Sequence, residues 1–493
     1  MELAEAEATD DFTVLIRREK RPRAPAAAMP DLPPDILLAA KILAEFAGAL
    51  LRRGSARQAA EAVCAEIDRK LTVQINAVLH HADFQAMEAS WRGLHFLVCN
   101  TETGPELKIK LIDISKRELS RSLRKYRGTA WDQSPIFRKI YEEEYGQFGG
   151  EPFAALVGDY LFDHRPEDVA LLADMAMISA AAHAPFITGA APSLMQMDSW
   201  AELANPRDLT RIFSTPEYTS WRSLREATDT RYIGLCMPRF LTRLPYGARS
   251  DPTEAFAFEE DAEGPDSSTY VWANAAYALA ANMTRAFATY GWCARIRGID
   301  SGGVVEGLPV PVFETADGET DLRGVVEIAL SERREADLAG SGLIPLVQRK
   351  NEGIAAFVSA QSLQKPIVYD DPAASANAVI SARLPYLLAC CRFAHFLKCM
   401  VRDKVGSTMS MGQLQRWLNG WVSGYVDGSP ESSSEDWKAT HPLQDAMVEV
   451  NAREDAPGQY EARFYLRPHY QLEGLSVALR LVSRLPSSQG SGL

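Results

Sequence analysis

The chain has 493 residues, of which 46% are hydrophobic and 24% charged, a composition typical of a globular protein with about two or three domains. Its formal net charge of −13 argues against a dedicated nucleic-acid-binding protein, because such proteins carry a basic surface that neutralises phosphates. The seven cysteines include no C-x-x-C pair, and their odd number in a long chain argues against a disulfide framework and favours a reducing compartment.

The N-terminal residues 1–35 predict a flexible tail, because a basic run at Arg17–Arg23 is followed by several prolines. Met1–Asp11 is acidic and is not typical of a signal peptide. The longest apolar stretches, Ile36–Leu51 and Ala173–Met195, contain charged residues or prolines, so neither is typical of a membrane span. We therefore expect a cytoplasmic protein with no membrane insertion.

Residues 36–82 predict two N-terminal helices, Ile36–Arg53 behind an Asp35 cap and Ala56–His80 behind Ser55. The second helix carries apolar side chains at every fourth position: Val63, Ile67, Leu71 and Ile75. Such a stripe usually forms a core or a helix–helix seam and not a cofactor site.

Residues 83–371 predict a main domain of mixed helices and strands, that is, an α/β or α+β fold class. The strand-like runs are Leu107–Asp113, Phe153–Leu161 and Ile367–Tyr369, and the helical stretches include Val169–Ala182 and Tyr270–Thr289. The acidic, turn-rich segment Glu259–Ser268 predicts a solvent-exposed loop, with Glu259 and Glu260 as solvated charges.

Residues 372–493 predict a separate C-terminal domain with 12 Lys and Arg against 11 Asp and Glu. Near-neutral charge suits a module with several packed interfaces, although a chance fluctuation explains it equally well. Two helical patterns, Ala373–Val405 and Met411–Tyr425, precede the strand-like runs Ala446–Val450, Tyr460–Arg467 and Leu475–Leu485. The last run alternates apolar and mixed faces, which suits either an internal strand or a strand added to another sheet.

The motifs of common enzyme classes are absent from the sequence, which has no Gly-Lys for a P-loop, no H-E-x-x-H and no G-x-S-x-G. His395 with Cys391 and Cys399 forms an i,i+4 set on one helix face, which is the best metal-ligand pattern in the chain. Its apolar surroundings favour a packed core helix instead. We expect no catalytic residue, cofactor or metal, and no enzyme.

Several clusters of rarer residues are more specific. They include Asp83–Leu94 (DFQAMEASWRGL), Tyr145–Pro152 (YGQFGGEP), His183–Phe186 (HAPF), Tyr218–Arg225 (YTSWRSLR), Pro238–Leu241 (PRFL), Leu384–Tyr386 (LPY) and Leu466–His469 (LRPH). Trp91 and Trp221, each followed by an arginine, are expected to set the fold. Together the clusters closely resemble the large sheath subunit of type VI secretion systems, the TssC/VipB family.

This resemblance implies a multidomain subunit like a phage-tail sheath, with N-terminal helices and a C-terminal inner domain that contributes strands to an inter-protomer sheet. The implied partners are a small sheath subunit, other protomers in six-fold helical rings, an inner tube protein, the baseplate and an AAA+ recycling unfoldase. Contraction of the sheath would propel the tube and its spike into a target cell. Residues 1–35 depart from the family pattern, which leaves recognition by the unfoldase open.

The resemblance also suggests where the assembly contacts lie. The stripe on Ala56–His80 is the expected seam with the small subunit. The expected strand-exchange interface comprises Phe464, Leu466, Val477, Leu479 and Leu481. Tube-facing candidates are the basic residues of the long C-terminal helix: Arg383, Arg392, Lys398, Arg402 and Lys404. The alternatives are the sheath of another contractile injection particle and a soluble α/β enzyme with an unrecognised site.

Overall fold

The computed structural model describes residues 56–128, 130–205, 208–248, 250–262, 269–314, 320–322, 324–350, 352–404, 407–452 and 460–469. By contacts the chain divides into two compact units, residues 1–75 and 76–493. Helix α3 spans Ala56–Leu79, close to the range Ala56–His80 that the sequence pattern predicts.

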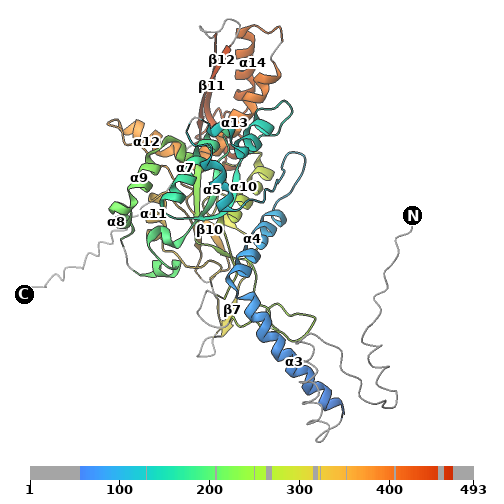
Figure 1. Ribbon diagram of the computed structural model, residues 1–493. Coiled ribbons are helices and arrows are strands. Elements are labelled where there is room, and N and C mark those ends of the chain that lie inside the picture. Colours follow the sequence, from blue (N-terminus) through green and yellow to red (C-terminus); the bar gives the residue numbers. More distant parts are fainter. Residues whose placement is uncertain are drawn as a thin grey trace, which may run out of the picture. The chain divides into compact units, whose positions relative to one another are not determined.

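A six-stranded sheet forms the centre of the second unit (Figure 1). Its strand order is β1-β2-β3-β9-β10-β6. Its strands are β1 (Leu156–Phe162), β2 (Phe186–Ala190), β3 (Ile233–Met237), β9 (Ile344–Gln348), β10 (Ala355–Phe357) and β6 (Val304–Val305). The first four are parallel to their neighbours, with Phe186 opposite Ile233 and Cys236 opposite Ile344. Strands β10 and β6 are added antiparallel.

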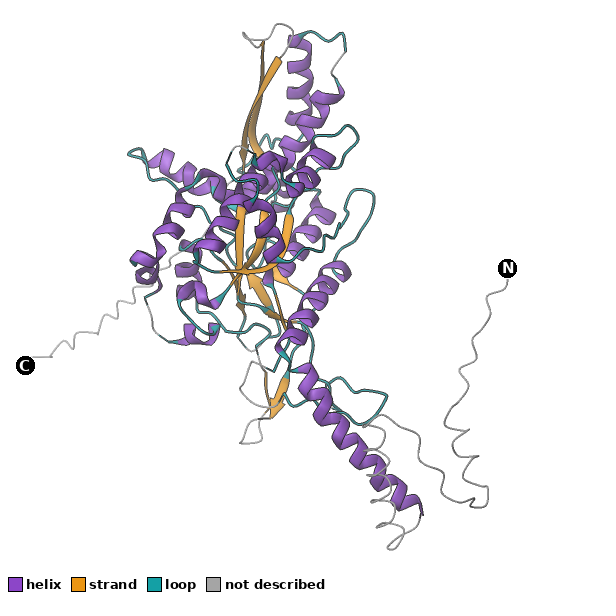
Figure 2. Ribbon diagram, in the orientation of Figure 1, coloured by secondary structure: helices purple, strands orange, loops and turns teal. Residues whose placement is uncertain are grey.

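Helices cover both faces of this sheet (Figure 2). Alternate residues of β3 divide between two apolar clusters, since Leu235 joins one and Cys236 the other. The first cluster contains α7 (Pro166–Ala182), α8 (Leu209–Ser214), α9 (Thr219–Glu226), α5 (Lys116–Arg124) and α11 (Glu332–Gly340). The second contains α10 (Ala275–Tyr290) and the start of α13 (Leu384–Asp403). Every residue of β2 and β3 is buried, which explains their almost uniformly apolar sequences.

Helix α4 (Ala82–Cys99) packs closely on α10 because Gly93 has no side chain. A Cβ built on Gly93 would lie 2.5 Å from the Tyr277 ring, so only glycine fits at this crossing. Trp91, two residues earlier, is 63% exposed, whereas Trp221 on α9 is fully buried. The expectation that both tryptophans set the fold is therefore wrong for Trp91.

The C-terminal part is a module of helices behind a two-stranded ribbon. Strands β11 (Leu443–Ala452) and β12 (Tyr460–Pro468) pair antiparallel. The helices are α12 (Pro372–Ser381), α13, α14 (Met411–Ser423) and α15 (Glu435–Thr440). A third apolar cluster joins Phe393 and Leu397 of α13 to Leu418 of α14 and Val448 of β11. Helix α13 thus belongs to two cores, its start to the sheet and its second half to the ribbon.

The remaining described elements are short. They are α6 (Pro135–Phe137), a π-helix at Arg138–Tyr145, the pair β4 (Phe240–Leu241) and β5 (Trp272–Ala273), the pair β7 (Val312–Glu314) and β8 (Thr320–Leu322), and five 3-10 turns. Among the described helices, α13 alone is long and apolar enough to cross a membrane, and half of its apolar window is buried inside the protein.

Three local predictions are wrong. Leu107–Asp113 is not a strand, and Leu111 is 68% exposed. Ile367–Tyr369 also forms no strand with the other described residues. Glu260 is buried, whereas the sequence predicted a solvated charge.

Candidate functional site

The β11–β12 ribbon has one packed face and one exposed face. Phe464 and Leu466 point with Val448 and Val450 toward α13 and α14, where they join the third apolar cluster. On the opposite face Met447 is 47% and Tyr465 49% exposed. The alternation read from Tyr460–Arg467 is therefore present, and the apolar side chains at 464 and 466 serve the core of their own chain.

The outer edge of β11 is partly occupied by side chains of α14. The Asn419 amide donates to the Val448 carbonyl at 2.7 Å and accepts the Val448 N–H at 2.9 Å, as a neighbouring strand would. The Gln415 side chain accepts the Val450 N–H at 3.3 Å. These bonds show that Val448 and Val450 direct their backbone groups away from β12.

The outer edge of β12 makes fewer bonds to the described residues than that of β11. Ala462 and Phe464 pair with Val450 and Val448, so their backbone groups also point outward, away from β11. Within the described part of the chain, the backbone groups of Ala462 and Phe464 on that edge have no bonded partner. Only the Leu466 carbonyl is reached, by the Tyr386 hydroxyl at 3.4 Å. The other three expected strand-exchange residues, Val477, Leu479 and Leu481, lie outside the described residues.

The expected seam residues lie along one face of α3. Ile67 and Leu71 are 42% and 40% exposed, and Val63 and Ile75 are half-buried. Glu66 binds Arg69 at 2.8 Å and Lys70 at 3.6 Å beside this stripe. The side chains of the stripe thus remain accessible along the helix.

The basic residues of α13 are mostly engaged within the chain. Lys398 lies 3.5 Å from the centre of the Tyr145 ring and donates to the Tyr141 hydroxyl at 2.9 Å. Arg402 donates to the Gln147 carbonyl at 2.5 Å. Both side chains therefore hold the π-helix and the glycine-rich loop that follows it.

Two further members of the set are also partly buried. Arg392 lies 4.5 Å from the Phe396 ring, and burial lowers the pKa of its guanidinium. Arg383 is the N-cap residue of α13 and is half-buried. Lys404 is the exposed member, 4.9 Å from the Trp417 ring. The five residues do not form one exposed basic stripe, and a tube-facing role for them stays a prediction.

The three potential metal ligands of α13 are part of the core. His395 is buried, its Nε2 bonds to the Ala182 carbonyl at 2.8 Å, and its ring packs edge-on against Tyr145. Burial lowers the pKa of His395 to about 4, so it is neutral at physiological pH. Burial also raises the pKa of the Cys391 thiol. Within the described residues there is no group of three or more acidic, His or Cys side chains placed to hold a metal.

A buried charge cluster was missed by the sequence reading. Arg243 donates to Glu260 through both terminal nitrogens, at 2.5 and 3.0 Å, and through Nε to Glu88 at 2.6 Å. Burial opposes its charge, but the two carboxylates together raise the pKa of Arg243. In the same loop as Glu260, the Glu259 carbonyl accepts from the Asn76 amide at 3.2 Å and the Asp261 N–H donates to the same amide at 2.9 Å. No local sequence signal indicates this cluster, because Arg243 lies 155 residues after Glu88.

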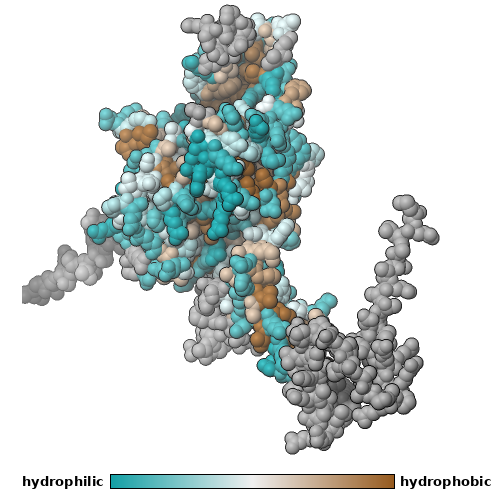
Figure 3. Space-filling view, viewed as in Figure 1, coloured by the Kyte–Doolittle hydropathy of each residue, from teal (hydrophilic) through white to brown (hydrophobic). Residues whose placement is uncertain are grey.

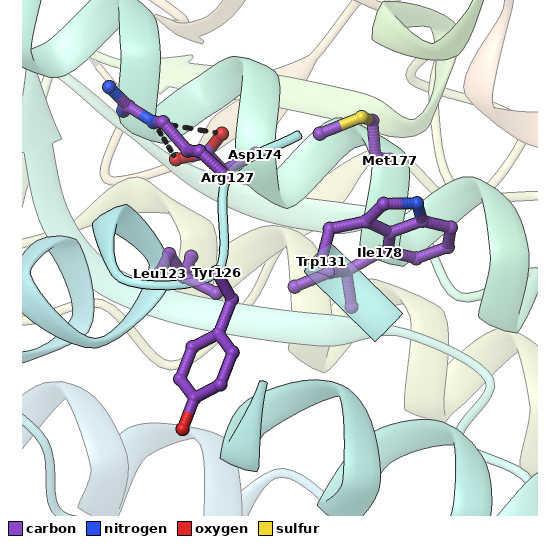
Figure 4. A pocket seen from close by; sticks show the side chains of 7 residues that line it. All are labelled: Leu123, Tyr126, Arg127, Trp131, Asp174, Met177 and Ile178. Carbon is purple, nitrogen blue, oxygen red and sulfur yellow. Dashed lines mark hydrogen bonds and ion pairs between the residues drawn. The ribbon is translucent and has the colours of Figure 1, made fainter. Parts of the chain in front are cut away.

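One small pocket lies between α5 and α7 (Figure 4). It is lined by Leu123, Tyr126, Arg127, Trp131, Asp174, Met177 and Ile178. The Nε of Arg127 donates to both carboxylate oxygens of Asp174, at 2.9 and 3.3 Å. Burial raises the pKa of Asp174 in spite of this bond. The lining residues offer one ion pair and otherwise mainly apolar surface, so they lack the convergent polar groups of a ligand site.

Comparisons with known proteins agree along the whole chain. A family model described as EvpB/VC_A0108, tail sheath N-terminal domain, matches residues 61–364. A second, described as the tail sheath gpW/gp25-like domain, matches residues 373–485. The Type VI secretion system sheath protein TssC1 of Pseudomonas aeruginosa is 58% identical over 485 residues, which are 98% of this chain and 96% of that protein.

Two solved structures from the anti-feeding prophage are weakly similar. Its baseplate aligns with a TM-score of 0.38 at 10% identity, covering 76% of this chain and 83% of that chain. Its contracted helical sheath gives 0.27 at 12% identity, covering 64% and 75%. Both scores are low, so the assignment depends on the family models and the full-length relative. The chain therefore belongs to the VipB family of tail-sheath proteins, and it is 58% identical to a type VI secretion system sheath protein over 98% of its length.

Proposed function

We propose that this chain is the large structural subunit of a type VI secretion contractile sheath. The observation that carries the proposal is the 58% identity to a type VI sheath protein over 98% of the chain. In this role the chain pairs with a small sheath subunit and stacks in six-fold helical rings around an inner tube, above a baseplate. It assembles in the cytoplasm and catalyses no reaction, since sheath subunits act by packing.

Pairing with the small subunit takes place along α3. The stripe of Val63, Ile67, Leu71 and Ile75 supports this, because two of its members expose about two fifths of their side chains. A helix with an accessible apolar face and flanking charges is suited to a helix–helix seam.

Neighbouring protomers are linked by a strand added to the outer edge of β12. The outward backbone groups of Ala462 and Phe464 supply a template for such pairing. The strand that is added comes from the Leu475–Leu485 segment of another copy. In this arrangement the backbone of β12 links protomers while the side chains of Phe464 and Leu466 hold the module together.

Contraction in this proposal is a repacking between two assembly states. Strand links hold the rings together while other surfaces slide, and a small gain per protomer adds up over many copies. Lys404, the exposed member of the α13 set, is the first candidate for a tube contact, because opposite charges steer such encounters.

The test is co-expression with the small sheath subunit, with imaging by electron microscopy. We expect long tubules from the full chain, and soluble heterodimers without tubules from a chain truncated after Gly474. A full chain that stays monomeric and forms no tubule in the presence of its small subunit would contradict the sheath function. Long tubules from the truncated chain would contradict only the strand link.

A further inference from the structure

Helix α5 (Lys116–Arg124) is firmly anchored in the first core. Ser115 and Glu118 form a capping box at its start, with the Glu118 carboxylate bonded to the Ser115 hydroxyl at 2.7 Å. Leu119 and Leu123 are 3% and 4% exposed and face α7. The orientation of the helix is therefore fixed by its cap and its two leucines.

The opposite side of the helix is a surface of positive charge. Arg117 lies four residues before Arg121, and Arg121 lies three and four residues before Arg124 and Lys125, which places all four on one face. All four are exposed, and Figure 3 shows a strongly hydrophilic surface over α5. We call these four residues the α5 basic face.

The α5 basic face forms no ion pair with the residues that the structure describes. Its neighbours Lys116 and Arg127 are bound to Asp168 and Asp174 at 2.7 and 2.9 Å. Among the described residues, by contrast, no carboxylate lies within ion-pairing distance of any of the four. The pKa of Glu118 is lowered mainly by the hydrogen bonds of its carboxylate to Ser115, and the charge of Arg121 makes a smaller contribution at longer range.

Helix stability accounts for only part of this arrangement. Arg121 and Arg124 lie in the last turn, where the helix dipole favours cations, but Arg117 in the first turn gains nothing from it. Like charges at i,i+4 destabilise an exposed helix, and Arg117–Arg121 and Arg121–Lys125 are such pairs.

A chain of net charge −13 that packs against copies of itself experiences mutual repulsion. A concentrated basic face relieves that repulsion where it meets an acidic surface of the next copy, and it also selects the register of the contact. The same acidity disfavours a nucleic acid or another polyanion as the partner.

We propose that the α5 basic face is a contact between sheath protomers, and that it binds an acidic surface of a second copy of this chain. This inference rests on the proposed sheath function. Beside the small-subunit seam and the strand link, the sheath then has a third contact, which is electrostatic and therefore sensitive to salt.

The test compares sheath formation by the wild-type chain and by the triple variant Arg117→Glu, Arg121→Glu, Arg124→Glu, each co-expressed with the small subunit. We expect the variant to form the heterodimer with unchanged helix content and to yield at least about tenfold fewer sheaths. Wild-type sheaths should shorten or dissociate as salt rises from 0.1 to about 1 M, where the screening length falls to about 3 Å.

Three controls make the result specific. The variant with lysine at all three positions keeps the charge and should assemble normally, and the glutamine variant covers the case in which the glutamate variant fails to fold. Charge reversal of Arg211, Lys350 and Lys365, which are equally exposed elsewhere, should leave assembly unchanged.

The outcomes separate the inference from the function beneath it. Absence of tubules from the wild-type chain would refute the sheath function itself. Normal sheaths from both the glutamate and the glutamine variants would overturn only the contact. Loss of the heterodimer from a folded variant would assign the face to the small subunit instead. If the wild-type chain is retained on heparin and the variant is not, while sheaths form normally, the face binds a polyanion. Either result overturns the proposal.

Discussion

The six-stranded sheet and the β11–β12 ribbon differ in how much of their surface is covered by helices. Strands β2 and β3 of the sheet are buried at every residue, between helices on both faces. The ribbon has helices on one face, while Met447 and Tyr465 remain about half exposed on the other. One of its edges is partly occupied by Asn419 and Gln415, whereas the backbone groups of Ala462 and Phe464 on the other edge have no partner among the described residues.

Because of this difference, we expect the sheet to determine the stability of the subunit and the ribbon edge to determine its assembly. A two-stranded ribbon is marginal by itself in water, so β11 and β12 depend on α13 and α14 for their core. Changes in the sheet should therefore unfold the chain. Changes on the open edge of the ribbon, or on the exposed face of α3, should instead leave the subunit folded and prevent its association.

The largest effect is expected in the sheet domain. Trp221→Ala removes a fully buried side chain of the first core and should lower the free energy of unfolding by about 3–5 kcal/mol. Trp91→Ala is the matched control, because Trp91 is 63% exposed, and it should change stability by about 0.5 kcal/mol or less. Chemical denaturation followed by circular dichroism measures both. Equal losses from the two variants would contradict the contrast between them.

A smaller effect on stability is expected at the ribbon edge, with a large effect on assembly. Ala462→Pro removes an N–H that points away from β11, so the ribbon should lose roughly 1 kcal/mol or less. Strand addition needs that donor, so heterodimers should form but sheaths should not. Arg463→Ala, on the exposed face of the same strand, should assemble normally. Sheaths of normal length from Ala462→Pro, seen by electron microscopy, would rule out this edge.

The smallest effect on the stability of the chain is expected on α3. Ile67→Asp with Leu71→Asp changes two exposed positions, so the folded chain should lose about 0.5 kcal/mol or less for each. Co-purification with the small subunit should nevertheless be lost, because two charges would enter an apolar seam. Val73→Asp is the control, since Val73 is 60% exposed and points to the opposite side of the helix. Unchanged co-purification of the double variant would place the seam elsewhere.

Local periodicity predicted much of the secondary structure. The helices α3, α7, α10, α13 and α14 and the strands β1, β11 and β12 lie where the spacing of apolar residues indicated them. It failed at Leu107–Asp113, where strand-like alternation has no neighbouring strand to pair with. Alternation shows that a segment can line a sheet, but pairing needs a partner that only the fold supplies.

The amino-acid sequence by itself determined the helices with a regular apolar stripe, the absence of common enzyme motifs and the resemblance to a sheath family. The tertiary structure alone decided that Trp221 is buried while Trp91 is exposed. It also decided that Lys398 and Arg402 hold the π-helix and its loop, and that Glu260 meets Arg243 and Glu88 in a buried cluster. The physical reason is distance along the chain. Arg243 and Glu88 are 155 residues apart, and a pairing at that separation leaves no periodic signal in either segment.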